Sequence, residues 1–214
     1  SVATQSHINH SPVLPAYAAK CEVIPYGIDA RGFKKTPALE QKARELREKH
    51  GPTALFVGRM VGYKGVEFLL SAMKHVPEPL RLVLIGDGPL REQLEAHARD
   101  LGIAGRVDFL GNVSDPELFS AHFLNARMFV LPSVSPNEAF GIVQLEAMAW
   151  SRPTICTKLD SGITEVNQDG VTGLHVEPSN PEALAQAMRQ LGGDEAKRKE
   201  MGEAARARFE RRFT

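Results

Sequence analysis

The stretch that decides the fold reads Ser133-Val-Ser-Pro-Asn-Glu-Ala-Phe-Gly-Ile-Val-Gln-Leu-Glu-Ala-Met-Ala149. A Pro-Asn turn signal precedes an apolar run, which predicts a loop leading into a helix over residues 140–151. Glu138 falls on the loop and Glu146 about two turns inside the helix, roughly 10 to 12 Å away by helix rise. Phe140-Gly141-Ile142 supplies the first free N–H groups of this helix, and its glycine leaves room for an anion. The pattern predicts a clamp for a phosphate flanked by hydroxyl-rich groups.

Short apolar runs alternate with helical patterns along the whole chain. The expected strands are 22–24, 54–57, 82–85, 107–110, 128–131, 154–156 and 173–176. The expected helices are 38–49, 66–74, 90–101, 116–125, 140–151, 181–190 and 195–211. Continuously apolar strands indicate burial on both faces of a parallel sheet. We therefore expect an α/β fold, a Rossmann-like doubly wound parallel sheet that binds ligands beyond the carboxyl ends of its strands.

Five motifs are in register with those of a known enzyme family. They are E-x7-E from Glu138 to Glu146, Val23-Ile-Pro-Tyr-Gly-Ile-Asp29, Phe56-Val-Gly-Arg-Met-Val-Gly-Tyr-Lys-Gly65, Leu84-Ile-Gly-Asp-Gly-Pro-Leu90 and Gly170-Val-Thr-Gly-Leu174. In this order they resemble the C-terminal, donor-binding half of retaining glycosyltransferases of the two-domain GT-B architecture. The group 1 family, also called family 4, matches the pattern best.

Two cations follow the second expected strand, in a loop with three glycines from Gly58 to Gly65. A guanidinium fork and an ammonium suit the diphosphate of a nucleotide sugar. The resemblance implies catalytic roles for Arg59 and Lys64, which would neutralise the charge that builds on the β-phosphate as the glycosidic bond breaks. No metal or other cofactor is then required, since these cations and the helix start at Phe140-Gly141 balance the diphosphate. The histidines show no metal-ligand spacing.

The two glutamates of the quoted stretch differ in their expected roles. Glu146 has apolar neighbours, so its carboxylate needs a partner, and the resemblance assigns it to the ribose hydroxyls. Glu138 is assigned to the donor hexose, as a third catalytic residue beside the anomeric carbon. The remaining donor contacts implied by the resemblance are Gly58, Gly86, Val113 at the base, Ala139, Phe140, Gly141 and Ile142.

Composition limits the partners and the compartment. Lys plus Arg and Asp plus Glu number 26 each, so no charge excess favours nucleic acid. Cys21 and Cys156 lack metal-ligand spacing and fit the reduced thiols of a cytoplasmic protein. The expected helix 195–211 is basic but contains several glutamates, so peripheral contact of the full-length enzyme with the inner membrane face stays open.

The resemblance also implies a domain organisation. Complete members of the family carry an upstream Rossmann-like domain that binds the acceptor. We therefore expect residues 1–20 to be a linker from that domain and residues 21–214 to be the nucleotide-sugar-binding domain. The whole enzyme would transfer a hexose, of the mannose type by likeness of the loop 161–173, from a nucleoside diphosphate sugar to a saccharide or lipid-linked acceptor. The present chain alone is expected to be inactive.

Other functions use similar features. Paired carboxylates also occur in glycoside hydrolases, about 5 to 9.5 Å apart across the scissile bond, but a glutamate deep in a helix beside cations fits donor binding better. A phosphorylase would need a lysine for pyridoxal phosphate, and no lysine has a matching context. A nucleotide-sugar epimerase on the same architecture and a non-catalytic nucleotide-sugar-binding module both remain alternatives.

Overall fold

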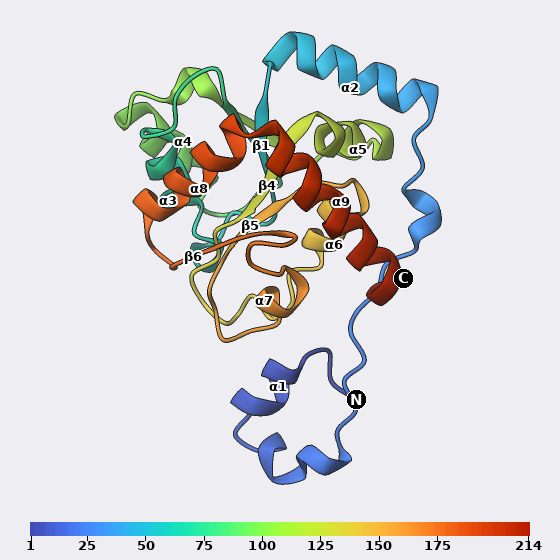
Figure 1. Ribbon diagram of the computed structural model, residues 1–214. Coiled ribbons are helices and arrows are strands. Elements are labelled where there is room, and N and C mark those ends of the chain that lie inside the picture. The colour runs from blue at the N-terminus through green and yellow to red at the C-terminus, as the bar shows by residue number, and fades with distance from the viewer.

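Six parallel strands form one sheet in the order β3-β2-β1-β4-β5-β6 (Figure 1). The structure is a computed structural model that describes residues 1–214. The strands are β1 (Thr53–Val57), β2 (Arg81–Ile85), β3 (Val107–Gly111), β4 (Ala126–Leu131), β5 (Thr154–Thr157) and β6 (Gly173–Val176). This strand order is that of the doubly wound Rossmann fold, so the expected fold class is confirmed.

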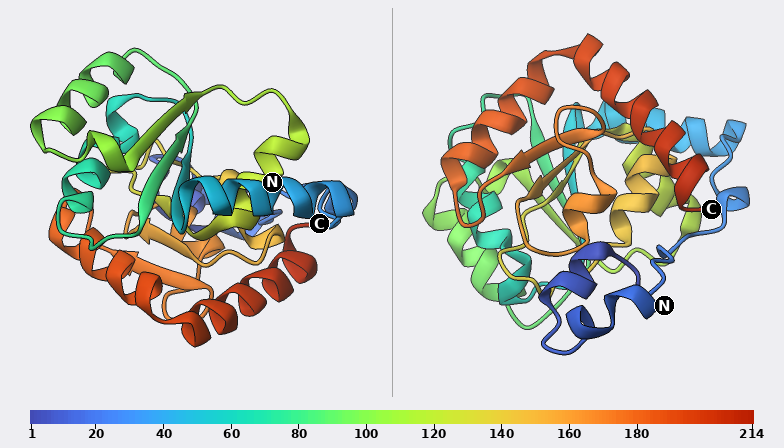
Figure 2. Two further views of the ribbon diagram at one scale, coloured as in Figure 1. Left: turned by 90° about the horizontal axis from the view of Figure 1, so that it is seen from above. Right: turned by 60° about the horizontal axis from the view of Figure 1, so that its bottom comes forward.

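Helices cover both faces of the sheet. They are α1 (Gln5–His10), α2 (Pro37–His50), α3 (Val66–Met73), α4 (Arg91–Asp100), α5 (Pro116–Asn125), α6 (Val143–Ala149), α7 (Ile163–Val166), α8 (Pro181–Gly193) and α9 (Glu195–Arg212), with 3-10 turns η1 (Leu14–Lys20), η2 (Ala30–Gly32), η3 (Gly62–Lys64) and η4 (Ala104–Arg106). One core packs α3, α4 and α8 on the sheet, a second packs α2, α5 and α6, and a smaller third core joins α6 to α9. Helix α9 passes the β6 edge and reaches α6 on the other face (Figure 2). No helix combines the length and the apolar character that crossing a membrane requires.

Alternation of side chains along the strands explains the continuous apolar runs. In β1, Ala54 and Phe56 belong to one core and Leu55 to the other. The same division holds in β4, where Met128 points to the first core and Phe129 to the second. Successive side chains of a strand point to opposite faces, so a strand covered on both faces needs an apolar residue at every position.

Three helices begin with the same local device. Thr36, Asp115 and Asn180 each accept a hydrogen bond from a first-turn N–H, and each is followed by a proline at the first helical position. A capping oxygen satisfies an otherwise free donor, and proline has the φ that a helix start requires. These starts lie within one residue of the expected ones for this reason.

One expected strand is absent from the sheet, and one expected helix is shorter than predicted. Residues 22–24 are not a strand of the sheet, because Val23 forms only an isolated bridge with Val2. The helix expected over 140–151 begins at Val143, since Gly141 adopts a φ of 67° that an α-helix cannot contain. Glu146 consequently lies in the first turn of α6 rather than two turns inside it.

The start of the chain, up to α1, packs against the domain, a feature the sequence did not indicate. The backbone N–H groups of Gln5 and Ser6 donate to the Glu165 carboxylate at 3.1 and 2.6 Å. Ile8 is buried. Figure 1 shows α1 below the sheet, near α7. Glu165 therefore holds the start of α1 in place.

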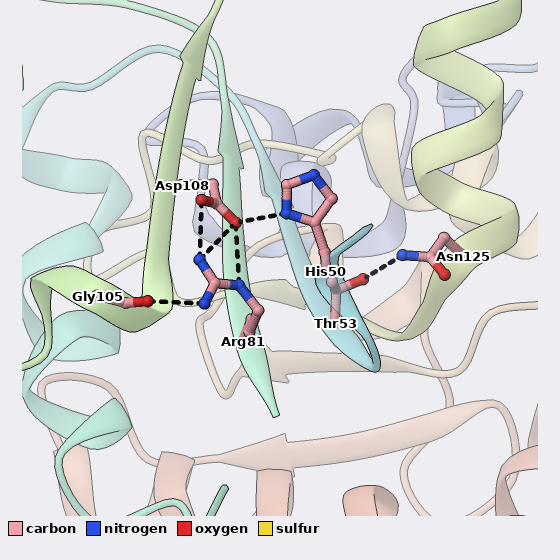
Figure 3. Close-up of polar contacts among 6 residues, drawn as sticks. All are labelled: His50, Thr53, Arg81, Gly105, Asp108 and Asn125. Carbon is pink, nitrogen blue, oxygen red and sulfur yellow. Dashed lines mark hydrogen bonds and ion pairs between the residues drawn. The ribbon is translucent and has the colours of Figure 1, made fainter. Parts of the chain in front are cut away.

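A polar cluster ties α2 to the amino-terminal ends of β2 and β3 (Figure 3). Arg81 donates from Nη2 to Asp108 Oδ1 at 3.0 Å and from Nε to Oδ2 at 3.3 Å. His50 Nδ1 lies 3.2 Å from the same Oδ2, and Arg81 also donates to the Gly105 carbonyl at 2.7 Å. One carboxylate thus joins three elements at the edge of the sheet.

We predict that Asp108→Asn lowers the free energy of unfolding by about 1 to 2 kcal/mol, because the half-buried Arg81 loses its charged partner. Urea unfolding measures the change. Asp100→Asn is the matched control, since Asp100 is exposed and its side chain makes no hydrogen bond, and it should stay within about 0.5 kcal/mol. Equal stabilities of the two variants would contradict this role for Asp108.

Candidate functional site

The strand order changes direction between β1 and β4, and a crevice opens there. Connections from β1 lead to β2 and β3, whereas those from β4 lead to β5 and β6. Loops that diverge in this way leave a space at the carboxyl ends of the strands. Two cavities of about 640 and 560 Å³ occupy it, and both are lined by Val57, Gly58 and Phe119. We call the two together the crevice.

A buried ion pair joins the loops that follow β1 and β4. Lys64 Nζ lies 2.5 Å from Glu138 Oε2, with the side chains 11% and 9% exposed. Ser133 Oγ donates to the same carboxylate oxygen at 2.8 Å, and Thr157 Oγ1 donates to the Ser133 carbonyl. Oε2 of Glu138 is thereby satisfied, while Oε1 has no partner within the chain.

Four consecutive backbone amides next to this pair are free. The N–H groups of Ala139, Phe140, Gly141 and Ile142 donate to no group of the chain, and all four residues line the same cavity as Lys64. They precede α6 and do not belong to its first turn, which corrects the expected origin of these donors. Free main-chain N–H groups beside an ammonium form a site suited to an anion.

Gly141 is needed for a different reason from the one expected. Its φ is 67°, and an added Cβ would lie 2.8 Å from Leu131 Cδ2 and 2.9 Å from Gln144 Nε2. A side chain would therefore meet the protein's own core, in a conformation that disfavours side chains. The glycine shapes the loop that carries the free amides.

Glu146 lines the same cavity and has no hydrogen-bond partner in the chain. Burial raises the pKa of its carboxyl from 4.5 to about 7. A half-buried carboxylate without donors is unfavourable when ionised. The site therefore holds an acceptor that only an external donor satisfies.

Arg59 lies in the adjoining cavity rather than in that of Lys64. It is exposed and takes part in no ion pair. Gly86 and Val113 line the same cavity as Arg59. Gly86 has a φ of 121°, and an added Cβ would lie 2.1 Å from the Gly58 carbonyl oxygen, so the loops after β1 and β2 touch through their backbones.

The sequence did not predict some of the residues that form the crevice. Ser133 supports Glu138, and its only signal was its place two residues beyond an expected strand. Tyr26 lines the cavity and packs edge-to-face on Phe140, with 5.1 Å between ring centroids. Phe119 joins the two cavities from α5. Tertiary packing brings these side chains to the crevice.

The fold and the crevice define a doubly wound α/β protein that is built to bind a ligand at its switch point. Residues 38–208 match the family model of the glycosyl transferases group 1. The chain belongs to the glycosyl transferases group 1, as its five motifs indicated. Its sheet and flanking helices have the fold seen in structures of the GT-B type.

Relatives support this assignment. The chain is 41% identical over 213 residues to D-rhamnosyltransferase WbpZ of Pseudomonas aeruginosa, covering 99% of this chain and 54% of that protein. It is 33% identical over 210 residues to O-antigen chain mannosyltransferase C of Escherichia coli, covering 98% and 55%. The chain thus spans about half the length of these relatives.

Solved structures show the same fold. The Anabaena protein Alr3699/HepE, solved in complex with UDP and glucose, aligns with a TM-score of 0.79 at 27% identity, over 90% of this chain and 52% of that one. The C-terminal domain of LpcC, a glycosyl transferase group 1 family protein of Francisella tularensis, aligns with a TM-score of 0.75 at 22% identity. That alignment covers 86% of this chain and 97% of the LpcC domain.

We predict that Glu146→Gln stabilises the chain at about pH 8 by on the order of 1 to 3 kcal/mol and leaves it unchanged at about pH 4. Between the ordinary pKa of 4.5 and about 7 the unfolded chain has released this proton while the folded chain still holds it. Stability therefore falls as pH rises through this window, and a neutral glutamine removes the loss.

Urea unfolding of both chains at the two pH values measures this difference. Glu92→Gln serves as the control, because Glu92 is exposed and its side chain makes no hydrogen bond. If the Glu146→Gln chain is less stable than the natural one at the higher pH, or if the difference in stability does not depend on pH, the raised pKa of Glu146 is refuted.

Proposed function

We propose that this chain is the donor-binding domain of a retaining glycosyltransferase that moves a hexose from a nucleoside diphosphate sugar to a saccharide or lipid-linked acceptor. The observation that carries the proposal is the buried pair of Lys64 and Glu138 beside four free amides in the crevice. Such a site offers positive charge and directed donors to an anion, with carboxylate oxygens nearby for hydroxyl groups.

In this proposal the diphosphate lies against the amides of 139–142 and between Lys64 and Arg59. These donors are fixed before the reaction and stabilise the charge that develops on the departing β-phosphate. They balance the diphosphate without a metal ion. The ammonium of Lys64 would then divide its contacts between the phosphate and Glu138.

The carboxylates complete the donor site. The ribose hydroxyls donate to Glu146, which replaces the missing partners of that half-buried group. Oε1 of Glu138, free of contacts in the chain, faces the hexose near the anomeric carbon. Val113 and Gly86 line the neighbouring cavity, where the base is bound.

The relatives support the class of donor. HepE was solved with UDP and glucose, and the two relatives carry the names of rhamnosyl and mannosyl transferases. D-rhamnose is 6-deoxymannose, so we propose a hexose of the mannose type. Both cysteines are free thiols, which agrees with action in the cytoplasm, at the membrane face where a lipid-linked acceptor would lie.

The acceptor half belongs to the proposal as well. The chain spans about half the length of its relatives, so we propose that residues 1–20 lead from an acceptor-binding domain and 21–214 form the donor domain. We propose retention of the anomeric configuration because the chain's motifs resemble those of the retaining family.

We predict that calorimetric titration with UDP, GDP and ADP finds selective one-to-one binding of one nucleotide, equally strong in EDTA. Arg59→Ala should weaken it by about tenfold, because one charge-assisted contact to the diphosphate is lost. Arg99→Ala, a change of an exposed arginine on α4 whose side chain makes no hydrogen bond, should bind like the natural chain. Failure of a folded chain to bind any of the three, or equal affinities in both variants, would contradict the proposal.

A further inference from the structure

Another cavity, which we call the second cavity, lies at the amino-terminal ends of the strands, opposite the crevice. It measures about 590 Å³ and is bordered by Pro52 before β1, Ala126 at the start of β4 and Pro153 before β5. Figure 1 shows this edge at the top of the view, where α2 leads into β1 and α8 passes into α9. The cavity shares no lining residue with the crevice.

Cations gather around this cavity without anionic partners. The lining includes Lys35, Arg47, Arg127, Arg152, Arg198 and Lys199. Glu195 and Glu203 also line it, but neither comes within ion-pair distance of any of these cations. An adjoining cavity of about 300 Å³ adds Arg44 and Glu40. Lysine and arginine side chains therefore outnumber glutamates in the lining of this partly buried cavity.

Three of the guanidinium groups are fixed by main-chain carbonyls. A guanidinium has five N–H donors, and each of these groups uses only one or two within the chain. The bonds run from Arg127 to Gly192 at 2.8 Å, from Arg152 to Trp150 at 2.8 Å and to Ala126 at 3.0 Å, and from Arg198 to Leu191 at 2.6 Å and to Gly192 at 3.0 Å. The remaining donors are held in place and are open to a ligand.

The cations also disfavour one another. The pKa of Arg152 is lowered to about 10, first by burial and then by the charges of Arg47 and Arg198. Burial, followed by the charge of Arg127, lowers the pKa of Arg198, and the carboxylates of Glu195 and Asp194 offset part of this shift. Like charges held together in a half-buried site are offset by an anion bound among them.

We propose that this cavity binds a small, soluble, phosphate-bearing anion at a site separate from the crevice. Arginine forks match the oxygens of phosphate, often through paired hydrogen bonds. The volume suits a small molecule, and the enclosing walls from α2, α9 and the strand ends suit a compact solute better than a flat membrane. Such a ligand would connect α2 and α9, which lie far apart in the sequence.

The test is a calorimetric titration of the chain with inorganic pyrophosphate. Arg47→Gln/Lys199→Gln removes two exposed cations of the cavity whose side chains make no hydrogen bond in the chain, so folding should be unaffected. Lys49→Gln/Arg211→Gln is the matched control, because it removes the same charge from the same two helices outside the cavity. We expect saturable binding that weakens about tenfold or more in the first pair and less than about twofold in the control.

Further measurements distinguish this cavity from other places where pyrophosphate or lipid could bind. Because the proposed donor site in the crevice also accepts a diphosphate, the titrations are repeated in the Arg59→Ala chain, where saturable pyrophosphate binding should remain and should still weaken about tenfold on adding Arg47→Gln/Lys199→Gln. Pyrophosphate binding that Arg59→Ala abolishes and Arg47→Gln/Lys199→Gln leaves unchanged would place the anion in the crevice alone and overturn the proposal. Equal losses in both double variants would show a general charge effect and also overturn it. Sedimentation with phosphatidylglycerol vesicles that excess pyrophosphate does not reverse would assign the cations to a lipid surface instead. Absence of any pyrophosphate binding contradicts the site outright.

Discussion

The buried ion pair between Lys64 and Glu138 is the interaction on which the rest of the site depends. It connects the loops after β1 and β4, at the one place where the order of the sheet changes direction. The same loops touch through their backbones, since an added Cβ at Gly65 would lie 2.2 Å from the Pro132 carbonyl oxygen. Removing one member of such a pair leaves an uncompensated buried charge. The pair therefore links the two loops at the crevice and keeps both charges at its wall.

The two ends of the sheet carry unpaired polar groups for different purposes. At the carboxyl end, the amides of 139–142 and the carboxylate of Glu146 have no hydrogen-bond partner in the chain and line the crevice. The strands that lead to the crevice are packed between two apolar cores. At the amino end, guanidinium groups are fixed by carbonyls yet lack carboxylates. Polar groups without partners reduce stability. Because these groups gather at the two ends of the strands, outside the well-packed layers, they indicate surfaces that bind a ligand.

Local chemistry explains what the sequence predicted well. Helix α5 was expected at its observed bounds because Asp115 caps it and Pro116 starts it, and β6 (Gly173–Val176) also has its expected bounds. Long-range contacts explain the failures. The start of α6 is set by the positive φ of Gly141, which packs on Leu131. Two N–H groups at the start of α1 donate to Glu165, a carboxylate 160 residues away from the first of them. The cations of the second cavity are scattered from residue 35 to residue 199, so no motif could indicate it.

In the proposed function, the crevice binds the diphosphate of a nucleotide through the free amides before α6. The most direct measurement is a ¹⁵N-resolved NMR titration of the chain with the nucleoside diphosphate that binds it best. We expect the amide signals of Ala139, Phe140, Gly141 and Ile142 to shift together with that of Gly58, in proportion to saturation. Saturable binding that leaves these five signals in place, with shifts elsewhere on the domain, would contradict it.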